Sequence, residues 1–162
     1  MQDLRQAFGA VPDLAATMAN SPPLVSSFVA VVGQFSAGTF AGGEREVLTL
    51  SNAVANSCPW AVAFHSTLAL REGIAAEDVE ATRRELPGPA RLAALSCSPG
   101  GSSSAAPLDR ADAQAFLDAG FDRAQILEVI TGVAASTLAN YAGNVTHPPL
   151  EPAFQAQAWA AG

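Results

Sequence analysis

A glutamate, a cysteine and a histidine lie within one short segment of the chain and could together do chemistry. The segment 44–74 reads EREVLTLSNAVANSCPWAVAFHSTLALREGI; in it Glu46 precedes Cys58 by twelve residues and His65 follows Cys58 by seven. Carboxylate and imidazole groups transfer protons, and a cysteine thiolate attacks electrophiles. The three residues therefore indicate acid–base chemistry, thiol chemistry or both, provided that the fold brings their side chains together.

Two helices are predicted to position these residues. The first, EREVLTLSNAVAN, repeats apolar residues at helical spacing. The second, SCPWAVAFHSTLALREG, has Ser57 as its N-cap, Pro59 in its first turn and Gly73 as its terminator. At about 1.5 Å per residue, Cys58 and His65 lie two turns and about 10 Å apart along the axis. They are thus expected to share a face of the second helix without direct contact.

Each of the three residues also has an ordinary structural explanation. Cys58 at a helix N-terminus could be a partly ionised nucleophile that needs an external thiol for turnover, or an inert core residue. His65 follows Phe64 on a mostly apolar helix and is either a functional imidazole or a core histidine. Glu46 either approaches the buried helices and acquires a raised pKa, or interacts with the helix N-terminus, a role that Glu44 fits better.

Helical patterns fill the rest of the chain and no alternating strand pattern occurs, so the predicted fold class is all-α. The segment SPGGSSSAAP, residues 98–107, is the low-complexity stretch and is predicted to be a flexible linker. Because its flanks look too short for independent domains, residues 1–162 are expected to form a single-domain compact helical bundle. Residues 129–145 carry no charge and are rich in small side chains, which suits either a central core helix or a subunit-interface helix.

The overall charge narrows the choice of partners. A formal net charge of -7 disfavours binding to nucleic acid or to an anionic membrane surface, so a small molecule or another protein chain is expected. The absence of lysine excludes a Schiff-base lysine and a phosphate-loop lysine.

The start, MQDLRQAFGA, lacks the apolar core of a secretory signal, and no run of about twenty apolar residues occurs. A soluble, cytoplasmic protein is therefore expected.

The run Glu46, Cys58 and His65 resembles the core of the alkylhydroperoxidase D and carboxymuconolactone decarboxylase family. MANSPPLVSSF, DAGFDRAQILEVI and ANYAGNVTHPPLEPAF are also similar to the corresponding parts of peroxidase-related members, so the likeness spans nearly the whole chain. The resemblance implies a compact all-helical domain that commonly forms homo-oligomers (dimers, trimers or hexamers), with the active site on a helical hairpin. It also implies an antioxidant oxidoreductase, a peroxidase whose substrates are a hydroperoxide and an external thiol reductant.

The chain departs from the redox signature of that family at one position. Redox-active members carry C-x-x-C followed four residues later by histidine, whereas this sequence has CPWA, so Ala61 stands where the second cysteine is expected. In those members the second thiol is thought to attack the peroxide and the first to resolve the sulfenic acid. The resemblance therefore leaves Cys58 in the resolving position. The missing thiol is the one that His65, one helical turn beyond residue 61, would contact.

Three functions from different classes remain open. The chain could be a one-cysteine or degenerate thiol peroxidase, with Cys58 as the redox thiol and Glu46 and His65 as a proton relay. It could be a lactone decarboxylase or related lyase, in which Glu46 and His65 do acid–base work on a small carboxylated substrate. It could also be a non-catalytic oligomeric binding protein. Arg45 and Arg71 are candidate clamps for an acidic lactone, although each stands beside an acidic residue.

The remaining cysteine and histidine and the single tyrosine match no chemistry of the family. Cys97 is expected to pack, His147 to lie in a turn before two prolines, and Tyr141 to be an interface or core phenol. Two separated cysteines and two histidines form no metal-site signature, so neither a metal nor another cofactor is expected.

Overall fold

The computed structural model describes residues 12–96 and 110–160. The predicted linker, 98–107, and Cys97 lie outside the described residues, so the linker and the single domain stay predictions. Within the described ranges the regular secondary structure is helical and includes no β-strand, which confirms the all-α prediction. The elements in chain order are α2 (Asp13–Met18), α3 (Pro22–Ser36), α4 (Gly42–Ala55), α5 (Pro59–Arg71), α6 (Ala76–Arg83), α7 (Ala90–Ala93), α8 (Arg110–Asp118), α9 (Arg123–Thr146) and the 3-10 helix η1 (Pro152–Gln157).

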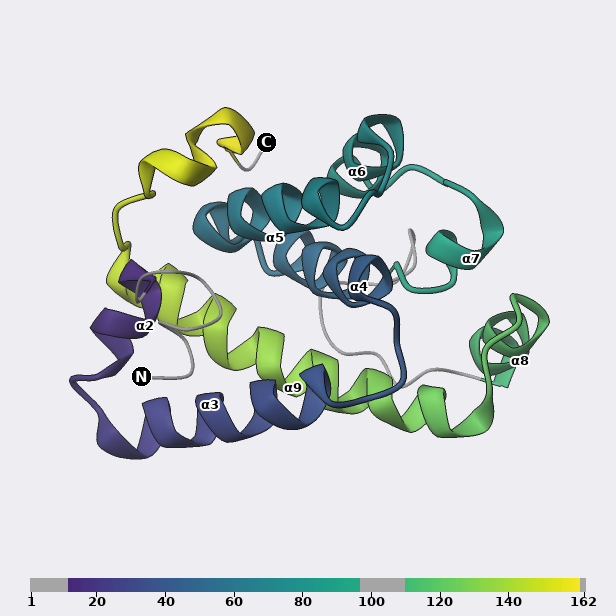
Figure 1. The fold of residues 1–162 in the computed structure, drawn as a ribbon, viewed down its shortest axis with the longest axis horizontal. Coiled ribbons are helices and arrows are strands. Elements are labelled where there is room, and N and C mark those ends of the chain that lie inside the picture. Colours follow the sequence, from purple (N-terminus) through teal and green to yellow (C-terminus); the bar gives the residue numbers. More distant parts are fainter. Residues whose placement is uncertain (1–11, 97–109, 161–162) are drawn as a thin grey trace.

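Helix α9 is the element on which the others assemble. Figure 1 shows this long helix running along the molecule, with α3 beside it and the α4–α5 pair packed across it. Helices α2 and α8 also contact α9, and α6 and η1 pack against α5. Among the helices that the structure describes, α9 included, none is both long and apolar enough to cross a membrane.

The ends of α9 follow from its sequence. Gln125 N–H donates a hydrogen bond to Asp122 Oδ1 at 2.8 Å, and Asp122 N–H donates to Gln125 Oε1 at 3.0 Å, which is a capping box. The helix ends at His147, whose φ of 45° places it in the left-handed region. The turn predicted at His147 is thereby confirmed.

The turn before α5 corrects one prediction. Ser57 is not the N-cap; it adopts a φ of 48°, and Cys58 is the N-cap instead. Cys58 N–H donates to Ala53 O at 3.0 Å, so the turn out of α4 takes up one residue more than expected and α5 begins at Pro59. At the other end, the predicted terminator Gly73 has a φ of 87° just beyond the helix.

Helices α4 and α5 form the hairpin that the family resemblance implies. Ala61 and Ala63 of α5 are fully buried, and such small side chains let neighbouring helices approach closely. Asn140 Nδ2 of α9 donates to Asn52 Oδ1 of α4 at 3.1 Å, and this buried hydrogen bond ties the hairpin to α9. The hairpin therefore has a fixed orientation relative to the long helix.

Candidate active site

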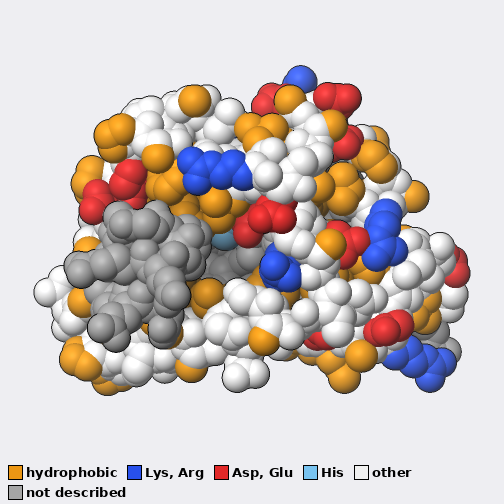
Figure 2. Space-filling view, viewed as in Figure 1, with side chains coloured by type: hydrophobic (Ala, Val, Ile, Leu, Met, Phe, Trp, Pro, Cys, Tyr) orange, Lys and Arg blue, Asp and Glu red, His pale blue; other side chains and the backbone are white. Residues whose placement is uncertain are grey.

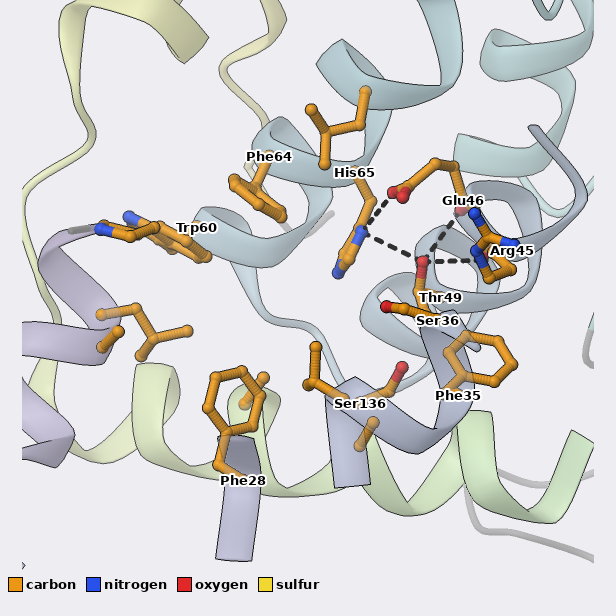
Figure 3. Close-up of a pocket in the computed structure, with 17 residues that line it drawn as sticks. Phe28, Phe35, Ser36, Arg45, Glu46, Thr49, Trp60, Phe64, His65 and Ser136 are labelled. Atoms are coloured by element: carbon orange, nitrogen blue, oxygen red, sulfur yellow. Dashed lines mark hydrogen bonds and ion pairs between the residues drawn. The ribbon is translucent and has the colours of Figure 1, made fainter. Parts of the chain in front are cut away.

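A cavity of about 130 Å³ lies between the hairpin and helices α2, α3 and α9. Figure 3 shows residues of the hairpin on one side of this cavity and residues of α3 and α9 on the other. Figure 2 shows hydrophobic, acidic and basic side chains close to a histidine on one face of the molecule. The aromatic lining residues are Phe28, Phe35, Trp60 and Phe64, and the polar ones are Ser36, Arg45, Glu46, Thr49, His65 and Ser136.

Trp60 and Phe64 form an aromatic wall of the cavity, which ring stacking and a hydrogen bond to a neighbouring carboxylate hold in place. The Trp60 and Phe64 rings stack with centroids 4.9 Å apart and an interplanar angle of 16°. Trp60 Nε1 donates to Glu151 Oε2 at 2.9 Å, and the other oxygen of Glu151 accepts from the N–H of Asp13 at 2.8 Å. One carboxylate thus joins α5, the start of α2 and the segment before η1. The wall is a preformed apolar surface for a small ring or chain.

Glu46 of α4 and His65 of α5 meet at the edge of this wall. His65 Nδ1 lies 2.8 Å from Glu46 Oε2 and 3.0 Å from Thr49 Oγ1. Glu46 and Thr49 are three residues apart, so one face of α4 presents both groups to the imidazole. The side chains of His65 and Glu46 are 15% and 19% exposed, which leaves them within reach of a bound molecule.

The hydrogen bonds around His65 select one tautomer. Thr49 Oγ1 donates to the carbonyl of Arg45 at 2.9 Å, so its lone pairs face the imidazole, and the carboxylate of Glu46 can only accept. Nδ1 therefore carries the proton and donates it toward these oxygens, while Nε2 is the basic nitrogen. Figure 3 shows the second ring nitrogen of His65 directed into the cavity, and it has no hydrogen-bond partner among the described residues. An imidazole oriented by a carboxylate in this way can act as a general base.

Arg45 is the cationic residue of the cavity. Its Nη1 donates to the carbonyl of Phe40, and no carboxylate in the described ranges forms a salt bridge with it. Arg71, the other candidate clamp, is exposed and does not line the cavity. Glu44 Oε1 forms a salt bridge with Arg91 Nε at 2.6 Å and none with Arg45. Its Oε2 accepts a hydrogen bond from the N–H of Ala41 at the start of α4. The positive charge of Arg45 is thus available to an anionic ligand.

Cys58 lies outside the cavity. Its side chain is 1% exposed, and it packs against α9 so closely that a Cβ added at Gly143 would lie 2.8 Å from its Sγ. Burial raises the pKa of the Cys58 thiol, and hydrogen bonds from the N–H groups of Ala61 and Trp60 offset only part of that rise. Ala61 is fully buried and does not line the cavity either. The structure therefore brings Glu46 and His65 together and leaves Cys58 apart from them.

Two other residues singled out in the sequence lie away from the cavity. Tyr141 is 61% exposed on α9, so it is not a core phenol of this chain, and His147 ends the same helix. Within the described ranges, no three histidine, cysteine, aspartate or glutamate side chains converge as metal ligands would. Glu46 and His65 are accordingly the cavity residues whose arrangement most clearly suits acid–base chemistry.

The sequence interpretation missed several residues of the cavity, among them Thr49, Trp60 and Ser136. Thr49 was recoverable, because it stands one turn after Glu46 on the same helix face. Trp60 and Ser136 reach the cavity only through tertiary packing of α5 and α9. Their positions carry no periodic signal that separates them from ordinary core residues.

Comparison with known proteins gives a family and a fold. Residues 26–95, which include α4 and α5, match the profile described as the Carboxymuconolactone decarboxylase family, and the predicted resemblance is thereby confirmed. The debrominase Bmp8 in its apo form has a TM-score of 0.77 at 19% identity, over 95% of this chain and 85% of that chain. A cysteine-to-alanine variant of Bmp8 in complex with 2,3,4-tribromopyrrole has a TM-score of 0.75 at 17% identity, over 95% of this chain and 84% of that chain. At such identities the likeness shows the fold alone. No curated protein matches the sequence.

Proposed function

We propose that this chain is an acid–base enzyme that acts on a small molecule bound in the cavity, since residues 26–95 match the carboxymuconolactone decarboxylase family. One observation carries the proposal: His65 Nδ1 contacts Glu46 Oε2 at 2.8 Å, while the other imidazole nitrogen faces an apolar cavity. Cys58 is incidental to this reaction, since it does not line the cavity.

In the proposed decarboxylation, the bond between the leaving carboxyl group and the adjacent carbon breaks, carbon dioxide departs, and the electron pair stays on the substrate as an enolate. His65 Nε2 takes the proton of that carboxyl group and returns it to the enolate carbon. The carboxylate of Glu46 holds the ring in the required tautomer and stabilises the imidazolium that forms. Thr49 Oγ1, at 3.0 Å from Nδ1, supports the same orientation. Arg45 would stabilise negative charge on a substrate carboxylate or on a developing enolate.

The size and lining of the cavity support a small cyclic substrate that has an apolar face and an anionic group. A volume of about 130 Å³ is close to that of an engineered protein cavity of about 150 Å³ that binds benzene. The Bmp8 complex with 2,3,4-tribromopyrrole adds that a protein of similar fold binds a small ring compound. A small carboxylated lactone, with its anionic group at Arg45, fits these constraints.

The test is the release of carbon dioxide from carboxymuconolactone by the parent and by single variants. We expect Glu46→Gln and His65→Gln to lower kcat/KM by about 10² to 10⁴, the usual contribution of general acid–base catalysis. Glu44→Gln is the matched control, because Glu44 lies on the same helix but pairs with Arg91 instead of facing the cavity. Full activity of Glu46→Gln would contradict the proposal.

A second candidate is a thiol-dependent peroxidase that works with one cysteine. The observation in its favour is the position of Cys58 at the start of α5, where the N–H groups of Ala61 and Trp60 hydrogen-bond the sulfur. The thiolate would attack the O–O bond of a hydroperoxide, releasing an alcohol and leaving a sulfenic acid that an external thiol reduces. Loss of hydroperoxide reduction in Cys58→Ser but not in Cys97→Ser would support this candidate.

We also infer that a second copy of the chain covers the exposed face of α9. Four of the large hydrophobic side chains that are exposed in the described ranges lie on this helix: Leu127, Ile130, Tyr141 and Val145, at 65%, 61%, 61% and 80%. Residues 129–145 carry no charge, so this face offers nothing to a charged partner, whereas two identical apolar faces complement each other across a two-fold axis. The predicted homo-oligomer would form through this surface.

Sedimentation velocity at micromolar concentration tests the assembly. We expect an oligomer in the parent and a monomer in Ile130→Glu, because a buried unpaired carboxylate opposes association. Leu86→Glu is the control, since Leu86 is also an exposed hydrophobic residue, at 47%, but lies outside α9. A parent that stays monomeric at every concentration would contradict the inference.

A further inference from the structure

The cavity contains one buried hydroxyl whose hydrogen-bonding capacity is unused. Ser136 is 3% exposed and lines the cavity, and its Oγ has no hydrogen-bond partner within the described parts of the chain. Figure 3 shows Ser136 on α9, across the cavity from His65, with its hydroxyl directed inward. A bound molecule would therefore meet the imidazole on one side and this hydroxyl on the other.

A serine inside a helix usually has another partner. Its hydroxyl can donate to the carbonyl four residues earlier, as Thr146 Oγ1 does to Ala142 O at 2.7 Å on the same helix. Ser136 does not make this bond with the carbonyl of Gly132. A buried hydroxyl without a partner costs free energy that a ligand's hydrogen bond recovers. The hydroxyl is thus poised to bind a polar group that enters the cavity.

The surroundings of Ser136 define the rest of the ligand. Ala135 and Ala139 of α9 also line the cavity and present only methyl groups. Phe28 and the stacked Trp60 and Phe64 rings supply aromatic surface around the same space. A flat ring with an apolar face matches this arrangement, with one hydrogen-bonding group at Ser136 in addition to the anionic group at Arg45.

We propose that Ser136 is a specificity-determining residue, which hydrogen-bonds a hydroxyl, carbonyl or ring N–H of a small planar substrate. The proposal rests on the proposed function, because it concerns the substrate of the same cavity. It adds a feature of the substrate: a ring-sized molecule that carries, besides its anionic group, a hydrogen-bonding group on the side opposite His65. No sequence motif identifies Ser136, and its role follows from burial, position and the missing partner.

Binding of phenol and toluene tests the proposal, since the two molecules have the same shape and differ by a hydroxyl in place of a methyl. Both are titrated into the full-length protein and followed by NMR. We expect Ser136→Ala to weaken phenol binding by about 2- to 10-fold, the factor expected for one net hydrogen bond, and to leave toluene binding within about 2-fold. This difference between the two ligands is what a purely structural role would not produce.

Ser66→Ala is the matched control. Ser66 Oγ is also buried without a partner in the described ranges, but Ser66 does not line the cavity, so its variant should change neither affinity. The proposal is overturned if Ser136→Ala leaves phenol binding unchanged, if it weakens both ligands equally, or if the parent binds neither molecule. Because binding requires no proton transfer, this outcome is independent of the kinetic test on Glu46.

Discussion

The thiol of Cys58 should react slowly in the folded protein. The side chain is 1% exposed, and its Sγ lies against the backbone of Gly143, where an added Cβ would be only 2.8 Å away. No reagent can approach the sulfur until the start of α5 separates from α9. Cys58 N–H also donates to Ala53 O at 3.0 Å, so that opening breaks the turn between α4 and α5 as well.

The size of the protection follows from the cost of this local opening. Local openings cost free energies between about zero and the full stability of the fold, and buried helix contacts lie toward the upper end. An opening of about 3 to 6 kcal/mol would slow alkylation by about 10² to 10⁴, at about 1.4 kcal/mol per tenfold. Burial also raises the pKa of the thiol, which lowers the thiolate fraction at neutral pH.

The assay is alkylation by iodoacetamide across pH in a Cys97→Ser background, with the protein folded and then in denaturant. We expect the folded protein to react at least about 10² more slowly and with a midpoint above that of an ordinary thiol, about 8.5. A folded rate at or above the denatured rate, with a midpoint below the ordinary value, would refute this reasoning. It would also restore the thiol peroxidase as the leading proposal.

The raised pKa of the Cys58 thiol also makes the free energy of unfolding depend on pH. Because the pKa of Cys58 is higher in the folded than in the unfolded chain, the unfolded chain releases this proton first as pH rises. The contribution of the neutral thiol is complete below the ordinary thiol pKa and is lost as pH rises through the folded value. Cys58→Ala should therefore flatten the alkaline decline in the free energy of unfolding, as measured by urea titration at several pH values.

Two further predictions concern packing. Ala61→Cys restores the C-x-x-C spacing at a fully buried position outside the cavity, so it should cost about 1 to 3 kcal/mol in urea unfolding and give no hydroperoxide reduction with a dithiol. A gain in that activity which His65→Ala abolishes would contradict this expectation. Gly132→Ala should cost a similar amount, about 1 to 3 kcal/mol, because its Cβ would lie 2.8 Å from both Leu48 Cδ2 and Phe35 Cζ. Gly33→Ala in α3, where nothing lies within 4 Å of the new Cβ, should be neutral or stabilising in the same measurement.

Local sequence signals predict the helices, and the family resemblance adds the pairing of Glu46 with His65. Apolar spacing and terminator residues place α4 and α5 nearly correctly, because these signals act within a few residues. A short connection between two apolar helices then brings them together as neighbours. Glu46 lies on α4 and His65 on α5, so the packing of these two helices is enough to bring the two side chains together.

Burial of Cys58 and the role of Ser136 depend on contacts between distant segments. The N-cap of α5 differs from the prediction by one residue, because a hydrogen bond from Cys58 N–H to Ala53 lengthens the turn. Whether the thiol then faces solvent or core is decided by Gly143, far along the chain, which leaves just enough room for the sulfur. The spacing of apolar residues along the sequence carries no information about the contact between Cys58 and Gly143.

The loss of the second cysteine and the burial of the first favour the same mechanism. Without a thiol at Ala61, a peroxidase cycle at Cys58 would need both a hydroperoxide and an external reductant to reach a sulfur that is 1% exposed. Proton transfer by His65 needs neither, because its ring already borders the cavity and its tautomer is set by Glu46 at 2.8 Å. With no thiol at position 61 and the thiol of Cys58 buried outside the cavity, the hairpin presents only the acid–base pair to a ligand, so the chemistry to test first is proton transfer at a small cyclic substrate.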